Sequence, residues 1–90
     1  MTIADPPLAL LHVLSISTCS PQACLEAVAS VVGRCDGRMR GFTLKPSGSR
    51  FEAVLRLSDI DEAAAWRVAG LISAWPDAGS AHIEHQMLAS

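Results

Sequence analysis

The feature that most constrains the fold of this chain is a strand–helix–strand pattern that occurs twice, about forty residues apart. Val28, Ala29 and the pair at 31–32 in the first half correspond to Val68, Ala69 and the pair at 71–72 in the second. Two such units with right-handed crossovers interleave into one four-stranded antiparallel sheet with both helices on one face. The sequence therefore predicts an α+β, ferredoxin-like βαββαβ domain with strand order 4-1-3-2.

Alternation of apolar and polar residues places the strands. The first strand lies within 9–18, and its predicted faces are Leu10, Leu14 and Ile16 inward and Val13, Ser15 and Ser17 outward. A second strand at about 38–45 and a third at 50–57 flank a turn at 46–49, which predicts a hairpin. The last strand is expected at 81–88, with Ile83 and Met87 inward.

Capping residues and apolar spacing define two helices. Ser20 followed by Pro21 starts the first, and its predicted inner stripe is Leu25, Val28, Val31 and Val32. Asp59, with Glu62 three residues later, is expected to cap the second, whose predicted inner stripe is Ala64, Val68, Leu71, Ile72 and Trp75. On these faces Leu71→Ala and Val28→Ala should each cost about 2–4 kcal/mol, and Trp66→Ala much less.

Length and composition predict one domain that leaves part of its apolar surface exposed. Residues 1–8 are expected to form a disordered tail and residues 9–90 the domain. A chain of 90 residues buries only about two-thirds of its unfolded surface, and 50% of its residues are hydrophobic against 18% charged. We therefore expect an apolar surface that a partner covers.

Charge and cysteine usage predict a cytoplasmic protein. The formal net charge is −2, and the seven basic residues are scattered, with only Arg34, Arg38 and Arg40 close together. This charge argues against binding nucleic acid or an anionic membrane. The apolar run at 8–16 is too short to span a bilayer, and Asp5 with two prolines stands where a signal peptide would be basic. Three cysteines at irregular spacing fit a reducing compartment.

The sequence predicts no catalytic or metal site and no cofactor. His82 and His85 are three apart on an expected strand, so they should point to opposite faces. The spacing of Cys19 and Cys24 does not fit structural zinc, and Cys24 and Cys35 read as small buried residues. The acidic residues at 59–62 suit a helix N-terminus, and no phosphate-binding or nucleophile motif occurs.

Two features have a functional interpretation beside a structural one. Trp66 lies about 200° round its helix from Val68, so it is expected on the surface, either covering a loop or anchoring a protein interface together with Arg67. The loop from Thr18 through Cys19 and Ser20 to Gln22 is either an ordinary capped turn or a site for a small anion such as an amino-acid carboxylate.

Three segments carry a resemblance to a known family: SPQACLEAV at 20–28, GRCDGRMRGFTL at 33–44 and AGLISAW at 69–75. Across about residues 11–87 the order of elements resembles an ACT-type regulatory domain, and more narrowly the short regulatory subunit of acetolactate synthase. The resemblance implies a non-catalytic dimer that activates a larger thiamine-diphosphate catalytic subunit in branched-chain amino-acid biosynthesis. Many members also bind an amino-acid effector near the first loop, here Thr18, Cys19, Ser20 and Gln22.

The resemblance also sets the expected details of regulation and assembly. Longer members have Pro-Gly in the first loop where this chain has Pro21-Gln22, so we expect weak or absent valine inhibition. A homodimer is expected through the second strands, an unpaired sheet edge where Gly41 allows close approach. The alternative is a stand-alone ACT-like sensor of a small molecule such as an amino acid, or an interaction domain of another pathway.

Overall fold

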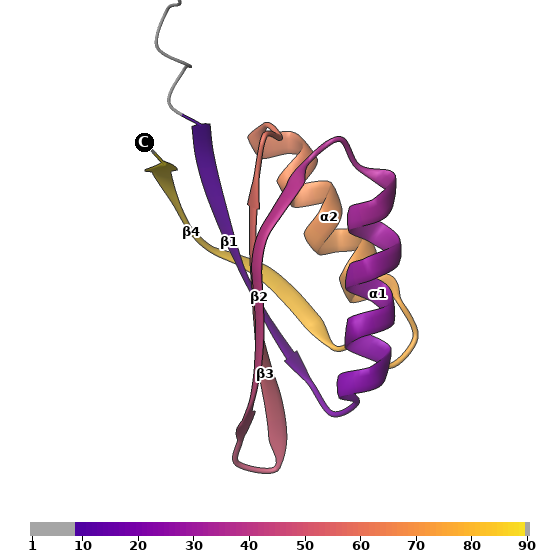
Figure 1. The fold of residues 1–90 in the computed structure, drawn as a ribbon. Coiled ribbons are helices and arrows are strands. Elements are labelled where there is room, and N and C mark those ends of the chain that lie inside the picture. Colours follow the sequence, from indigo (N-terminus) through magenta and orange to yellow (C-terminus); the bar gives the residue numbers. More distant parts are fainter. Residues whose placement is uncertain (1–8, 90) are drawn as a thin grey trace, which may run out of the picture.

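The computed structural model describes the backbone of residues 9–89 and the side chains of residues 11–84. The predicted tail therefore lies outside the described residues, as do the side chains of Leu10 and Met87. The elements are β1 (Ala9–Thr18), α1 (Pro21–Arg34), β2 (Arg38–Ser47), β3 (Arg50–Ser58), α2 (Glu62–Ala74) and β4 (Ser80–Ala89). They form one sheet of order β2-β3-β1-β4 (Figure 1), which confirms the predicted ferredoxin-like fold and strand order.

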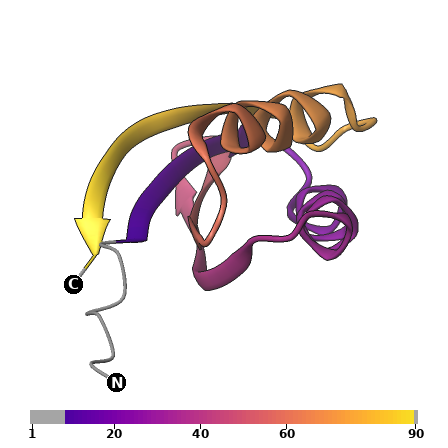
Figure 2. The same cartoon turned by 90° about the horizontal axis from the view of Figure 1, so that it is seen from above.

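The sheet is antiparallel throughout, with β1 paired to both β3 and β4. Leu14 stands opposite Leu55 on one side and Ile83 on the other, which sets the inward face of all three strands. The two helices lie on this face, and β1 and β4 curve away side by side at their far ends (Figure 2). The opposite face of the sheet, here called the outer face, carries no helix, as is common for antiparallel sheets.

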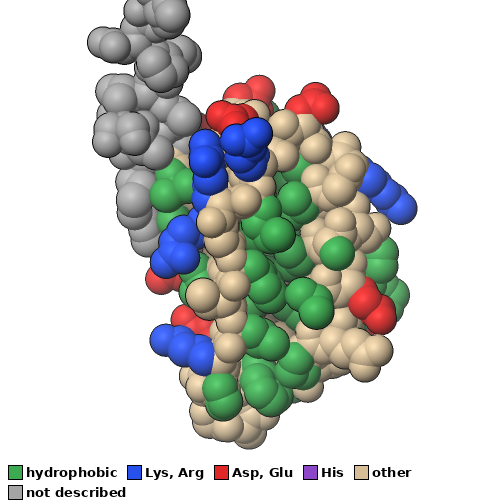
Figure 3. Space-filling view, viewed as in Figure 1, with side chains coloured by type: hydrophobic (Ala, Val, Ile, Leu, Met, Phe, Trp, Pro, Cys, Tyr) green, Lys and Arg blue, Asp and Glu red, His purple; other side chains and the backbone are tan. Residues whose placement is uncertain are grey.

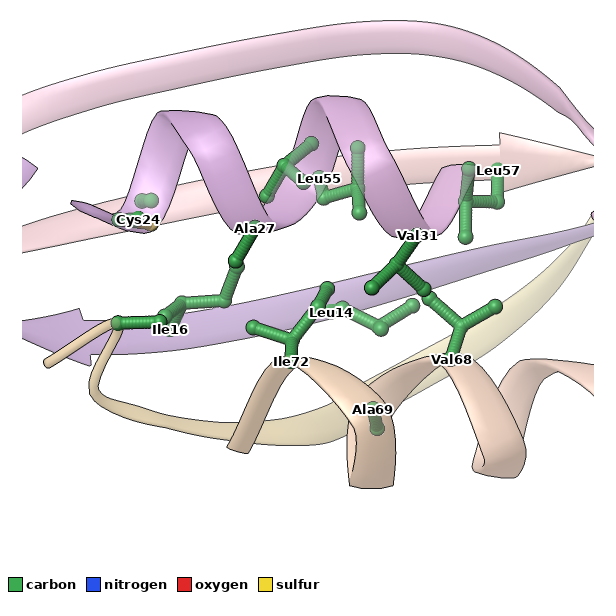
Figure 4. Close-up of a cluster of buried hydrophobic side chains, with 13 residues drawn as sticks. Leu14, Ile16, Cys24, Ala27, Val31, Leu55, Leu57, Val68, Ala69 and Ile72 are labelled. Atoms are coloured by element: carbon green, nitrogen blue, oxygen red, sulfur yellow. The ribbon is translucent and has the colours of Figure 1, made fainter. Parts of the chain in front are cut away.

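The core lies between the sheet and the two helices. Leu14 and Ile16 of β1 and Leu55 and Leu57 of β3 are fully buried and meet the helix side chains (Figure 4). The predicted alternation of β3 is thereby confirmed. Val13 and Ser15 take the outer face as predicted, but they too are nearly buried because β1 has a strand on either side.

Helix α1 begins as predicted, but two of its four predicted inward residues are not fully buried: Leu25 is exposed and Val32 is partly buried. Ser20 caps it, accepting a hydrogen bond from the Ala23 amide, and Pro21 is its first residue. The buried residues are Cys24, Ala27, Val28 and Val31, whereas Leu25 is 53% exposed. The prediction of an inward Leu25 was wrong because Cys24 and Val31, seven residues apart, lie at the centre of the buried face. Leu25 is turned about 100° from Cys24.

Helix α2 differs from the prediction in both cap and face. Asp61, not Asp59, is the N-cap: its Oδ1 accepts from the Ala64 amide at 2.7 Å, while Asp59 has a left-handed backbone with φ of 64°. The buried residues are Ala65, Val68, Ala69 and Ile72. Leu71, predicted inward, is 56% exposed. Apolar residues cover a wide arc of α2. The sheet packs against the part of this arc that contains Ala65 and Ala69, and Leu71 lies at the edge of that part.

The helix layer leaves part of β2 uncovered. Met39, Phe42 and Leu44 pair with Leu57, Leu55 and Ala53, so they share the inward face. Phe42 is half-buried, but Met39 is 49% and Leu44 38% exposed. Figure 3 shows hydrophobic side chains at the surface between β2 and α1. This apolar strip is the surplus surface that the composition predicted.

Candidate functional site

The loop between β1 and α1 is held together by its own hydroxyl groups. The Thr18 hydroxyl accepts from the Ser20 amide and donates to the Ser20 carbonyl oxygen, both at 3.0 Å. Thr18 is fully buried, and the Ser20 side chain is committed to the helix cap. The amide of Gln22 lies in the first helical turn, where it has no intrahelical acceptor. The structure thus places the four predicted effector residues in one capped turn, in which Cys19 and Gln22 are exposed.

Arg50 of β3 reaches across the sheet end to this loop. Its guanidinium donates to the Ser17 hydroxyl at 2.9 Å, the Ser17 carbonyl oxygen at 3.2 Å and the Cys19 Sγ at 2.9 Å. The sequence interpretation missed Arg50, because 31 residues separate it from Cys19. Only the strand register, which sets Thr18 opposite Phe51, could have indicated the contact. These partners are neutral, so none of them offsets the positive charge of the exposed guanidinium.

A shallow depression of about 320 Å³ lies beside Arg50 on the outer face. Its lining residues are Ser15, Ser17, Ser47, Arg50, Phe51, Glu52 and Glu84. None of the four predicted effector residues lines it, so the effector site at the loop stays a prediction. The mixture of one cation, two carboxylates and three hydroxyls suits a small polar molecule that carries charges of both signs.

Gly79, in the turn before β4, packs directly against the backbone of Ser17 and Thr18. Its φ is 108°, a conformation that L side chains rarely adopt, and a Cβ there would overlap the Ser17 carbonyl oxygen. The turn leaving α2 therefore touches the loop entering α1. Any shift of the Ser17 backbone on ligand binding must be accommodated by the Gly79 turn.

A second hollow, of about 420 Å³, separates the end of α1 from the start of α2. Its apolar wall includes Val31, Val68 and Leu71, and its rim carries charged residues of both signs: Arg34, Asp36, Asp59, Asp61 and Arg67. Arg67 thus faces this groove. Trp66, 56% exposed as expected, lies about 100° further round α2 and does not line this groove, so its predicted interface with Arg67 stays a prediction.

The residues considered as metal ligands from the sequence are a histidine pair on β4 and the cysteines. A β-bulge shifts the register of β4: His82 pairs with Ser15 and His85 with Val13. The side chain of His85 lies outside the described side chains, so the expectation that the two imidazoles point to opposite faces stays a prediction. Among the described residues no three His, Cys, Asp or Glu side chains are placed to hold a metal ion. Cys24 is buried as expected, whereas Cys35 is half-buried and donates its thiol to the Val32 carbonyl at 3.2 Å.

Comparison with solved structures supports the fold. The ACT domain of a GTP pyrophosphokinase from Chlorobium tepidum is 11% identical, with a TM-score of 0.67 over 83% of this chain and 97% of that one. The C-terminal domain of the MgtC protein from Mycobacterium tuberculosis is 14% identical, with a TM-score of 0.65 over 93% and 89%. A de novo designed protein, Ferredog-Diesel, is 12% identical, with a TM-score of 0.52 over 94% and 92%.

Sequence comparison adds no family to this likeness. No protein-family model matches the chain, and no curated protein matches it. At 11–14% identity the structural likeness establishes an ACT-like, ferredoxin-like fold and leaves the function to be argued from the chain itself. Among the described residues, no helix is both long and apolar enough to cross a membrane.

Proposed function

We propose that this chain is a non-catalytic regulatory subunit that dimerises and activates the catalytic subunit of a thiamine-diphosphate acetolactate synthase. The observation that carries the proposal is the apolar strip of Met39, Phe42 and Leu44 beside the unpaired edge of β2. A strand edge next to exposed apolar side chains favours pairing with another chain. The sequence resemblance and the fold likeness to an ACT domain support the regulatory role.

Mixing the purified chain with the catalytic subunit tests the proposal. The chain alone should form no acetolactate, and its addition should raise the activity of the catalytic subunit several-fold. Valine should inhibit weakly or not at all, because Pro21-Gln22 replaces the family's Pro-Gly. Absence of stimulation at saturating concentrations would remove the assignment.

The surface of α2 around Trp66 is the proposed contact with the catalytic subunit. Trp66 is 56% exposed, and exposed tryptophan is enriched at binding hot spots. Trp66→Ala should weaken activation without loss of folding. Leu71→Ala is a matched control, because Leu71 is equally exposed but lies on the groove side of α2. Equal losses for the two variants would argue against a specific contact at Trp66.

A stand-alone sensor of a small amino-acid-like molecule is the second candidate. The depression beside Arg50 supports it, since that guanidinium is fixed by Ser17 and Cys19 while its charge is not neutralised by them. A rise in melting temperature with a free amino acid and no partner protein would favour this candidate. Arg50→Gln should then abolish the rise.

A further inference from the structure

The charges of the chain are strongly separated between the β2–β3 hairpin and the rest. Residues 38–58 contain five basic residues and one acidic residue, a net charge of +4. The remainder has two basic and eight acidic residues, a net charge of −6, which together give the −2 of the whole chain. Five of the seven basic residues are thus gathered on two adjacent strands.

Strand register places all five basic residues on the outer face of the sheet. Because Leu55 and Leu57 point into the core, Arg50, Glu52, Arg56 and Ser58 of β3 point outward. Their partners on β2 share that face, including Lys45 opposite Glu52 and Arg38 opposite Ser58. A β-bulge between Met39 and Gly41 makes Arg40 the extra residue. Its Nε donates to the Ser58 hydroxyl at 2.7 Å, so Arg40 joins the outer face as well.

Three of these arginines come together at one end of the hairpin. Arg40 is tied to Ser58, the register partner of Arg38. The Arg56 guanidinium lies over Gly41, where a Cβ would come within 3.5 Å of Nη1. All three arginines are exposed, and the Ser58 hydroxyl does not neutralise Arg40. Like charges gathered at one end of two paired strands repel one another, and bound anionic groups would relieve the repulsion.

Two acidic residues near this end, Asp36 and Asp59, line the groove between the helices. In Figure 3 the Lys and Arg side chains follow the side of β2 that faces away from the apolar surface, with Asp and Glu side chains beside them at several points. On the outer face of the hairpin, Glu52 is the one acidic residue. Glu84 of β4 approaches only the Arg50 end, where both carboxylates line the depression.

We propose that this basic face, defined as the outward side chains of Arg38, Arg40, Lys45, Arg50 and Arg56, docks an acidic segment of a partner protein. The charges of the face match such a segment, and the hairpin is long enough to contact it along two strands of nine or ten residues. A longer polyanion, such as a nucleic-acid duplex or a bilayer surface, would also meet the net −6 of the remaining chain. Because the positive charge is confined to the hairpin, an acidic protein segment is favoured over such a polyanion. The inference is independent of the partner assigned above.

Poly-L-glutamate is the probe that tests the basic face without the catalytic subunit. Binding to the ¹⁵N-labelled chain at low salt should shift the amide resonances of β2 and β3 and weaken steeply as salt is added. The variant Arg38→Gln/Arg56→Gln should bind about tenfold more weakly. It avoids Arg40, whose bond to Ser58 supports the bulge. The control Arg34→Gln/Arg67→Gln removes the same charge from the groove side and should bind within about twofold of the original chain.

Two kinds of result would overturn the proposal, and a third separates it from the proposed function. Resonance shifts centred on the helices, or equal weakening by the two variants, would show that net charge and not this face attracts the probe. Tighter binding of a DNA duplex or of phosphatidylserine vesicles than of poly-L-glutamate would assign the face to another class of partner. Failure of the catalytic subunit to bind, with poly-L-glutamate still mapping to the hairpin, would remove the proposed function and leave this inference intact.

Discussion

The Nε2 atom of His12 lies 3.0 Å from the carbonyl oxygen of Ile60, a residue 48 positions along the chain. A carbonyl oxygen only accepts, so Nε2 is the donor of this hydrogen bond. His12 is fully buried, and its Nδ1 has no hydrogen-bond partner among the described residues. The ring therefore fastens β1 to the turn before α2 and leaves its other nitrogen without a hydrogen bond to the described residues.

His12→Ala should lower the free energy of unfolding by about 2–4 kcal/mol, because it leaves a cavity and an unpaired Ile60 carbonyl. His82→Ala is the control, since His82 is exposed on β4 and should change stability by less than about 0.5 kcal/mol. Urea unfolding of both variants measures the difference. A His12→Ala loss as small as that of the control would show that the hydrogen bond contributes nothing.

The helix faces predict a stability order that differs from the one expected from sequence. Ile72→Ala should cost about 2–5 kcal/mol and Val28→Ala about 2–3 kcal/mol, because both side chains are buried in the core. Leu71→Ala should cost under about 1 kcal/mol, because Leu71 is 56% exposed and alanine favours the helix. Guanidinium chloride titrations of the three variants measure the loss of unfolding free energy for each and so give the order. A Leu71→Ala loss equal to that of Ile72→Ala would contradict this orientation of α2.

The cysteines should differ in reactivity and in their effect on alkaline stability. Burial raises the pKa of the Cys24 thiol above its ordinary value of 9.0, so Cys24 should resist iodoacetamide until the protein unfolds. Cys19 is exposed and should be alkylated first. Unfolding lets Cys24 ionise at a lower pH than in the folded state, so its contribution to stability is complete below about pH 9 and is lost at higher pH. Peptide mapping after brief alkylation, and removal of the alkaline loss by Cys24→Ala, check both points.

Dimer formation through β2 should depend on its apolar strip. Light scattering at tens of micromolar should give twice the chain mass, and Leu44→Lys should give a monomer because it places a charge in the strip. Leu71→Lys introduces the same charge at an exposed position on α2 and should leave the dimer intact. A monomeric original chain would refute pairing through β2.

Hydrophobic periodicity was sufficient to predict the fold because each element carries a distinct repeat. The alternation of β3 and the Ser20 cap are local features, and both are confirmed. The inner face of α2 could not be predicted in the same way, since apolar residues occupy too wide an arc to select Ala65 over Leu71. Packing against the sheet makes that selection.

The basic face and the Arg50 contacts were missed for a different reason. A bulge adds one residue, Arg40, and reverses the alternation of β2 beyond it, and no residue pattern marked its position. The contacts of Arg50 join segments more than thirty residues apart, so they follow from pairing register and not from composition. Both features depend on the pairing register, that is, on which residues of neighbouring strands stand opposite each other.

The strand order has a consequence for how the chain is made. Strand β1 lies at the centre of the sheet, yet one of its two neighbours is β4, with Ala9 opposite Ala89. During synthesis, residues 80–89 reach the exterior of the ribosome after the other three strands, and until then one side of β1 has no hydrogen-bonding partner. A nascent chain, or one cut before Ser80, would thus present the apolar run of β1 as an open edge, which is the template that aggregation uses. Chaperone dependence should therefore be greatest for chains truncated within the α2–β4 turn.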